Sequence, residues 1–144
     1  MRARSFVDTN ILVYAHDKGS GARHDQAEVL VERLWRERSG VISIQVIQEF
    51  YVNVRRRAQN PIPPVEARRL VKDYLCWEVV INTGDSILEV LDFERRFDLS
   101  FWDALIVQAA NASGAKTLYS EDLNHGQIYG MVKVLNPFLA RSEE

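Results

Sequence analysis

Four acidic residues stand far apart in the chain, at places where a fold of alternating strands and helices would bring side chains together. Asp8 follows one short apolar run and Asp122 follows another. Glu49 lies early in a segment with helical spacing, and Asp103 lies in the first turn of a segment that is apolar almost all round. Ligands bind at the carboxyl edge of an open α/β sheet. All four carboxylates could therefore project into one crevice at that edge.

Carboxylates gathered in one crevice would call for a cation. Two of them roughly 4 Å apart repel by about 4 kcal/mol at an effective dielectric of 20, so several pairs would rival the stability of a domain. Ligands that are all oxygen favour Mg²⁺ or Mn²⁺ over Zn²⁺. Taken singly, each acid has a simpler interpretation: Asp8 could cap a helix, Asp103 could stabilise a helix dipole, and Glu49 could be solvated.

The elements that would position these acids alternate along the chain. We expect one helix whose cap is Thr9 or Asn10, another capped by Thr83, Gly84 and Asp85, and a third that starts at Ser100. Strands are expected near residues 6–7, 41–44, 79–81, 116–119 and 131–135, and further helices over 24–38, 45–57 and 65–75. This alternation predicts an α/β fold with a mostly parallel sheet of about five strands and helices on both faces. No repeat is visible, and residues 1–144 are expected to form one domain.

Local patterns also predict where particular side chains lie. Gly40 is expected to end the second helix. In the helix that starts near residue 83, the spacing of Ile87, Leu88 and Leu91 predicts that they face the core. The single cysteine, Cys76, cannot form an internal disulfide. It is expected to be a half-buried thiol in a reducing cytoplasm.

Composition limits the possible partners. The formal net charge is −2, so no global basic field attracts nucleic acid, and any such partner must meet a local patch. No stretch reaches the roughly 18 apolar residues that span a bilayer, so we expect a soluble cytoplasmic protein with no membrane contact. Two other acid-based chemistries fit poorly. A haloacid-dehalogenase-type phosphatase would need Asp at position 10, which is Asn, and the buried lysine of a receiver domain has no clear counterpart.

Four motifs together resemble the PIN-domain ribonucleases, in particular the VapC-type toxins of prokaryotic toxin–antitoxin pairs. The motifs are V-D-T-N, Q-V-I-Q-E-F, S-F-W-D-A-L-I and L-Y-S-E-D-L-N-H-G-Q, and the resemblance runs from about residue 6 to residue 138. It implies a three-layer α/β/α PIN domain over residues 1–144. It also implies one or two Mg²⁺ or Mn²⁺ ions held by the catalytic acids Asp8, Glu49, Asp103 and Asp122.

The same resemblance implies roles for three polar neighbours. Thr9 or Asn10 would steady the first acid, and Ser120 would help to place the fourth. Glu121 adjoins Asp122, and either acid could face the site. The hydroxyl-x-acid spacing from Ser120 favours Asp122.

The implied chemistry is hydrolysis of RNA phosphodiester bonds, with divalent ions that polarise a phosphate and activate water, leaving a 5′ phosphate and a 3′ hydroxyl. RNA must then be attracted by basic residues beside the acids. The runs that could do so, each of which could also be a solvated helix face, are Arg55, Arg56 and Arg57, then Arg68 and Arg69, and Arg95 and Arg96.

Partners follow from the resemblance as well. A VapC-type toxin would pair with a small antitoxin protein whose helix covers the acidic crevice, and it would form a homodimer. The alternative function, from another class, is a PIN-like module that binds RNA or a protein without cutting.

Overall fold

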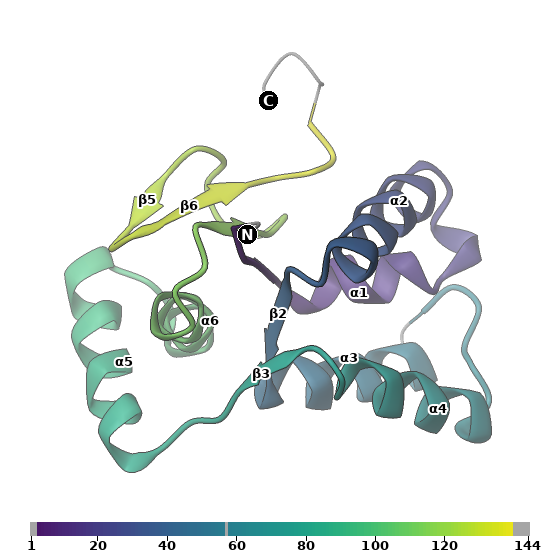
Figure 1. Cartoon of the computed structure of the whole chain (residues 1–144), viewed down its shortest axis with the longest axis horizontal. Coiled ribbons are helices and arrows are strands. Elements are labelled where there is room, and N and C mark those ends of the chain that lie inside the picture. Colours follow the sequence, from purple (N-terminus) through teal and green to yellow (C-terminus); the bar gives the residue numbers. More distant parts are fainter. Residues whose placement is uncertain (1–2, 57, 140–144) are drawn as a thin grey trace.

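One six-stranded sheet, with helices against both of its faces, organises the part of the chain that the computed structural model describes, residues 3–56 and 58–139 (Figure 1). The strands are β1 (Ser5–Val7), β2 (Gly40–Ser43), β3 (Glu78–Val80), β4 (Thr117–Tyr119), β5 (Ile128–Tyr129) and β6 (Val132–Leu135). The helices are α1 (Thr9–Ala15), a 3₁₀ turn at Lys18–Ser20, α2 (Ala22–Glu37), α3 (Ile44–Arg56), α4 (Pro64–Tyr74), α5 (Gly84–Phe97) and α6 (Phe101–Ala112).

The order of the strands shows where the sheet opens a crevice. The order is β3-β2-β1-β4-β6-β5, and every pairing is parallel except that of β5 with β6. From β1 the chain first builds outward through β2 and β3, and later returns to place β4 on the other side of β1. The carboxyl ends of β1 and β4 therefore form a topological switch point, where α/β proteins open a crevice for ligands.

The layers are those of the predicted three-layer fold, which is confirmed. Figure 1 shows α1 to α4 on one side of the sheet and α5 with α6 on the other. Helix α6 packs between α5 and the sheet, and seven consecutive residues from Ala104 to Ala110 are buried. This burial explains why its sequence is apolar almost all round. The sheet has one strand more than expected because a two-residue strand, β5, folds back on β6 at Gly130 (φ +65°).

Two local expectations were wrong. Helix α2 ends at Glu37, with Arg38 in the left-handed conformation (φ 55°), and Gly40 instead begins β2. A Cβ at Gly40 would collide with the Trp77 ring, so this glycine serves close packing rather than helix termination. Helix α1 is capped by Asp8, not by Thr9 or Asn10.

Two expectations about burial were also wrong. Leu88 and Leu91 are exposed on α5, and the fully buried residue of that helix is Val90. Cys76 is exposed too, because it lies in the turn after α4 rather than under a helix. Within the described ranges, no helix is both long and apolar enough to cross a membrane.

Candidate active site

Asp8 occupies the centre of the crevice and is held from two directions. It directly follows β1, caps α1, and is only 8% exposed. Its Oδ1 accepts a hydrogen bond from the Thr9 backbone N–H (2.7 Å), and its Oδ2 accepts one from the Ser120 hydroxyl (2.9 Å). Ser120 directly follows β4 and is fully buried; its Oγ also accepts from the backbone N–H of Asp122 (3.2 Å). One hydroxyl thus links the first and fourth predicted acids.

Glu49 reaches the same crevice from α3. This helix starts immediately after β2, so its first two turns lie at the carboxyl edge of the sheet. The Thr9 hydroxyl donates to Glu49 Oε1 (2.8 Å), and the Gln45 amide donates to Glu49 Oε2 (3.3 Å). Thr9, predicted to steady the first acid, therefore contacts two acids: its backbone holds Asp8 and its side chain holds Glu49.

Asp122 and Asp103 lie on the side of the crevice opposite α3. Asn10 donates from Nδ2 to Asp122 Oδ2 (3.2 Å), so this amide holds the fourth acid rather than the first. Asp103 lies in the first turn of α6, where its backbone N–H donates to the capping hydroxyl of Ser100 (3.1 Å). Asp103 is partly exposed, and its carboxylate accepts no hydrogen bond from the described residues.

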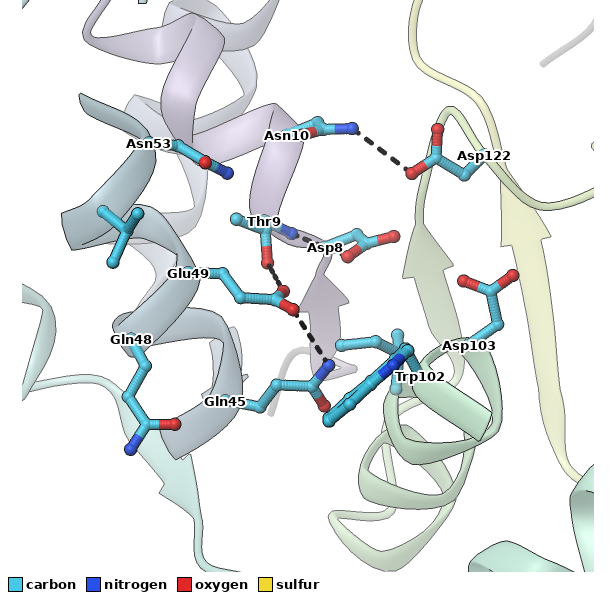
Figure 2. Close-up of a pocket in the computed structure, with 12 residues that line it drawn as sticks. Asp8, Thr9, Asn10, Gln45, Gln48, Glu49, Asn53, Trp102, Asp103 and Asp122 are labelled. Carbon is cyan, nitrogen blue, oxygen red and sulfur yellow. Dashed lines mark hydrogen bonds between the residues drawn. The ribbon is translucent and has the colours of Figure 1, made fainter. Parts of the chain in front are cut away.

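The four acids come from four segments and line one cavity of about 460 Å³ (Figure 2). Its lining consists of Asp8, Thr9, Asn10, Gln45, Gln48, Glu49, Val52, Asn53, Trp102, Asp103, Ile106 and Asp122. The structure therefore brings all four predicted acids to one place.

The electrostatics of the pocket are those of crowded negative charge. Burial is the main reason that the pKa of Asp8 rises to about 6; nearby Asp122 and Glu49 raise it further, against the hydrogen bonds that lower it. Burial also raises the pKa of Asp122, followed by the charges of Asp103 and Glu121. A cation would relieve both effects.

Glu121 points away from this pocket although it adjoins Asp122. The Tyr14 hydroxyl donates to Glu121 Oε1 (2.9 Å), and Arg23 Nε donates to Oε2 (2.6 Å). The Arg23 guanidinium lies over the rings of Tyr14 and Phe138, which fixes it beside the carboxylate. Of the two adjacent acids, Asp122 is thus the one that lines the cavity.

The donor set suits a hard divalent cation. The polar groups of the lining residues include carboxylate, hydroxyl and amide oxygens, the ligands that Mg²⁺ and Mn²⁺ prefer. Across residues 3–56 and 58–139, no three His, Cys, Asp or Glu side chains stand close enough to form a metal site by themselves. Mg²⁺ does not require this, because it commonly keeps several waters and binds through one or two carboxylates plus substrate phosphates.

The basic residues predicted to contact RNA lie outside the cavity. Arg55 donates to the backbone carbonyl of Ile62 (3.2 Å), and Arg56 is exposed at the end of α3. Arg57 lies outside the described residues. The other predicted positions, none of which lines the cavity, are Arg68 and Arg69 on α4 and Arg95 and Arg96 on α5. Their contact with RNA stays a prediction.

Apart from Thr9 and Asn10, sequence reasoning did not single out the uncharged lining residues. Trp102 and the amides of Gln45, Gln48 and Asn53 line the cavity beside the acids. The helical spacing of residues 45, 48, 49, 52 and 53, which places one face of α3 toward the crevice, was a usable signal.

Comparisons with known proteins identify the family and the fold. The family model of the PIN domain matches residues 5–130, and the chain belongs to the PIN-domain family. This match confirms the resemblance inferred from the four motifs. A search among curated protein sequences found no match.

Solved structures share the fold. One is VapC20 of Mycobacterium tuberculosis, described as a sarcin–ricin-loop-cleaving toxin, with a TM-score of 0.60 and 23% identity over 82% of this chain and 89% of that one. Another is a toxin–antitoxin complex from Klebsiella pneumoniae, with a TM-score of 0.66 and 19% identity over 93% and 98%. A third is FitAcB of Neisseria gonorrhoeae, with a TM-score of 0.61 and 12% identity over 93% and 98%.

Proposed function

We propose that this PIN domain is a divalent-metal-dependent endoribonuclease that hydrolyses RNA phosphodiester bonds. The observation that carries the proposal is the convergence of Asp8, Glu49, Asp103 and Asp122 on one open cavity, with the pKa of Asp8 raised to about 6. Raised carboxylate pKa values in a cleft are typical of functional sites. A purely structural cluster of acids would instead be paired with cations or fully hydrogen-bonded.

The proposed ligands are the four acids, and the proposed ion is Mg²⁺ or Mn²⁺. A bound ion of this kind would polarise the scissile phosphate and stabilise the negative charge that develops during hydrolysis. The chain's own residues then hold the acids in place. Ser120 orients Asp8. Thr9 orients Glu49, and Asn10 orients Asp122.

The decisive experiment replaces Asp103 by Asn in the full chain. Because the Asp103 carboxylate accepts no hydrogen bond from the described residues, the variant should fold as the wild type does. We expect cleavage of a mixed RNA pool in Mg²⁺ to fall more than about 100-fold, above the 10–100-fold typical of residues that only support a metal ligand. EDTA should abolish the wild-type activity. Asp92→Asn, at an exposed acid of α5, is the matched control.

Unchanged cleavage by purified Asp103→Asn would reject the nuclease proposal. Absence of metal-dependent cleavage by the wild type would favour the alternative, a PIN-like module that binds RNA or a protein without cutting.

We further propose that the protein is the toxin of a VapBC-type toxin–antitoxin pair and acts in the cytoplasm. Support comes from PIN-domain membership and from neighbours described as a toxin and as a toxin–antitoxin complex. A small antitoxin protein would cover the acidic cavity, and the toxin would form a homodimer. Light scattering during size-exclusion chromatography tests the dimer, which a monomer at micromolar concentration would contradict.

A further inference from the structure

One face of the sheet is left partly open where β4 and β6 pair. Helix α6 packs on these two strands from one side, whereas α2 and α3, on the other side, pack on β2. Along β6, buried Val132 and Val134 alternate with exposed Lys133 and half-buried Leu135. Parallel strands in α/β proteins usually have helices on both faces. Within the described chain, the face of β4 and β6 that points away from α6 is therefore short of a covering helix.

This open face and the flank of α2 form a groove of about 640 Å³, larger than the acidic cavity of about 460 Å³. Figure 1 shows the elements on its two sides, α2 on one and β6 with the chain that follows it on the other. Val29 is 69% exposed and Leu139 is 41% exposed, although both are aliphatic. Exposed aliphatic side chains gathered in a groove are typical of an interaction surface. We call it the α2–β6 groove, and the side chains that define it are Val29, Leu30, Arg33, Lys133, Leu135 and Leu139.

The wall of the groove that follows β6 is fixed in place. Phe138 packs edge to face on Tyr14, with ring centroids 5.4 Å apart, and the Arg23 guanidinium lies over the Phe138 ring. Its neighbours Pro137 and Leu139 line the groove. The contacts of Phe138 with α1 and α2 thus anchor the segment that presents them. A surface that is already formed loses little conformational entropy when a partner binds.

Two cations of the groove have no acidic partner among the described residues. Arg33 donates to the Tyr119 hydroxyl (3.1 Å), which leaves other guanidinium N–H groups for a further acceptor. Lys133 is exposed, and neither cation forms an ion pair with a described residue. Asp25 also lines the groove, but it lies about two turns of α2 before Arg33. An aliphatic floor beside unpaired positive charge is complementary to a surface that is aliphatic and acidic.

This combination favours protein over RNA as the occupant. An RNA strand would use the two cations but leave the aliphatic floor unused, because bases stack on aromatic rings. A helix is the element that covers a parallel sheet in this class of fold. Spacing of i, i+3 and i+4 places aliphatic and acidic side chains on one face of a helix.

We propose that the α2–β6 groove docks an amphipathic helix of a partner protein. Large aliphatic side chains of that helix fill the floor, and its carboxylates pair with Arg33 and Lys133. The inference goes beyond the proposed nuclease function and does not depend on it, because the groove and the acidic cavity share no lining residue.

The test uses three synthetic alanine-rich peptides of about sixteen residues, long enough to be helical in water. All carry leucines along one face, and the flanking positions hold glutamate, glutamine or lysine. Fluorescence polarisation measures the Kd of each peptide for the full chain, and amide chemical shifts locate the contact. The glutamate peptide should bind most tightly, and the amide signals that it shifts should be those of α2, β4 and β6.

Four variants at exposed side chains sharpen the result. Val29→Asp should weaken binding of the glutamate peptide by about tenfold, the contribution of one buried valine side chain. Lys133→Glu should weaken binding of the glutamate peptide and tighten binding of the lysine peptide, each by about fivefold. The matched controls, Val65→Asp and Lys72→Glu, change exposed side chains of α4 outside the groove and should bind every peptide as the wild type does. All four variants should cut RNA as the wild type does.

Several outcomes would overturn the proposal. They are equal affinity for the three peptides, no measurable binding of the glutamate peptide, shifted signals away from α2, β4 and β6, or binding that Val29→Asp and Lys133→Glu leave unchanged. Conversion of a dimer to a monomer by Lys133→Glu, without peptide binding, would assign the groove to an interface between copies. Weaker RNA affinity in Lys133→Glu, again without peptide binding, would make it a nucleic-acid surface. A wild type that binds the glutamate peptide at this groove but cuts no RNA would retain the docking site and reject the nuclease.

Discussion

Two buried aspartates lie at opposite ends of α1, and their surroundings differ in kind. Asp8 precedes the helix and Asp17 follows it, with 8% and 3% of their surfaces exposed. Asp17 accepts hydrogen bonds from the backbone N–H groups of Gln59 (2.8 Å) and Asn60 (3.0 Å), and from the Ser20 hydroxyl (2.9 Å). From the described residues Asp8 accepts two hydrogen bonds, and it faces other acids.

The pKa values of the two groups move in opposite directions. Burial raises the pKa of Asp17, but the hydrogen bonds from Gln59 and Asn60 outweigh it, so the net shift is downward. At Asp8 burial prevails, and the pKa rises to about 6. A buried carboxylate that the chain has satisfied stabilises the fold. A buried carboxylate that lies among like charges, as Asp8 does, can instead bind a cation.

The largest effect should come from removing the Asp8 charge. Asp8→Asn should reduce RNA cleavage in Mg²⁺ by more than about 100-fold, because the central one of the proposed metal ligands is lost. Its stability in EDTA at pH 7 should equal or exceed that of the wild type, because an uncompensated buried charge is gone. Urea unfolding and cleavage assays on the same preparation check both expectations. A variant that cuts RNA normally would remove Asp8 from the site.

Asp17→Asn should instead lower the stability of the fold and leave RNA cleavage unchanged. Placing an amide N–H₂ against backbone donors would break charge-assisted hydrogen bonds that tie the end of α1 to the loop before α4. The free energy of unfolding should fall by about 3–4 kcal/mol, since such bonds contribute about 1.5–3 kcal/mol each. The folded fraction should keep the wild-type kcat. Unchanged stability in urea would show that this clamp contributes little.

The pH dependence of stability should differ between the two sites. In metal-free protein, folded Asp8 holds its proton up to about pH 6, whereas the unfolded group releases it near 3.8. The folded state then binds more protons between these values, so stability should fall as pH rises across this window, by up to about 3 kcal/mol. Asp17 acts oppositely: its lowered pKa stabilises the fold above pH 3.8 and this contribution is lost as pH falls.

Urea titrations at pH 4.5 and 7 in EDTA measure this difference. Asp8→Asn should flatten the decline of stability with rising pH. Mg²⁺ in place of EDTA should reverse that decline in the wild type at pH 7, because the ion would bind the ionised carboxylates. Identical pH profiles for wild type and Asp8→Asn would contradict the raised pKa.

The smallest effect should come from Glu121→Gln. Its carboxylate is bound by Tyr14 and by the half-exposed Arg23 rather than lining the cavity. Cleavage should stay within about threefold of wild type, and stability should fall by less than about 1 kcal/mol. Asp122→Asn, one residue on, should lower cleavage by more than about tenfold. Equal losses in the two variants would mean that both acids serve the site.

Local patterns were sufficient for the alternation of elements and for the acids at strand ends. An apolar run that stops at Asp8, and a first-turn acid in an apolar helix at Asp103, can be read without knowledge of distant contacts, because periodicity and capping are properties of neighbouring residues. The fold class followed from that alternation. The exposed leucines of α5 did not follow, because apolar spacing on a helix does not say which side meets α6.

The pairing of polar side chains was decided only by the tertiary structure. Thr9 holds Glu49 across 40 residues, and Ser120 holds Asp8 across 112. The spacing from Ser120 favoured Asp122 over Glu121, and the tertiary structure shows Glu121 held outside the cavity by Tyr14 and by Arg23 of α2. The sequence by itself determined which residues could hold a cation and roughly which element carries each. The order of the strands in the sheet brought those elements to one edge. Only the tertiary structure decided this order, because long-range packing sets it and no local pattern encodes it.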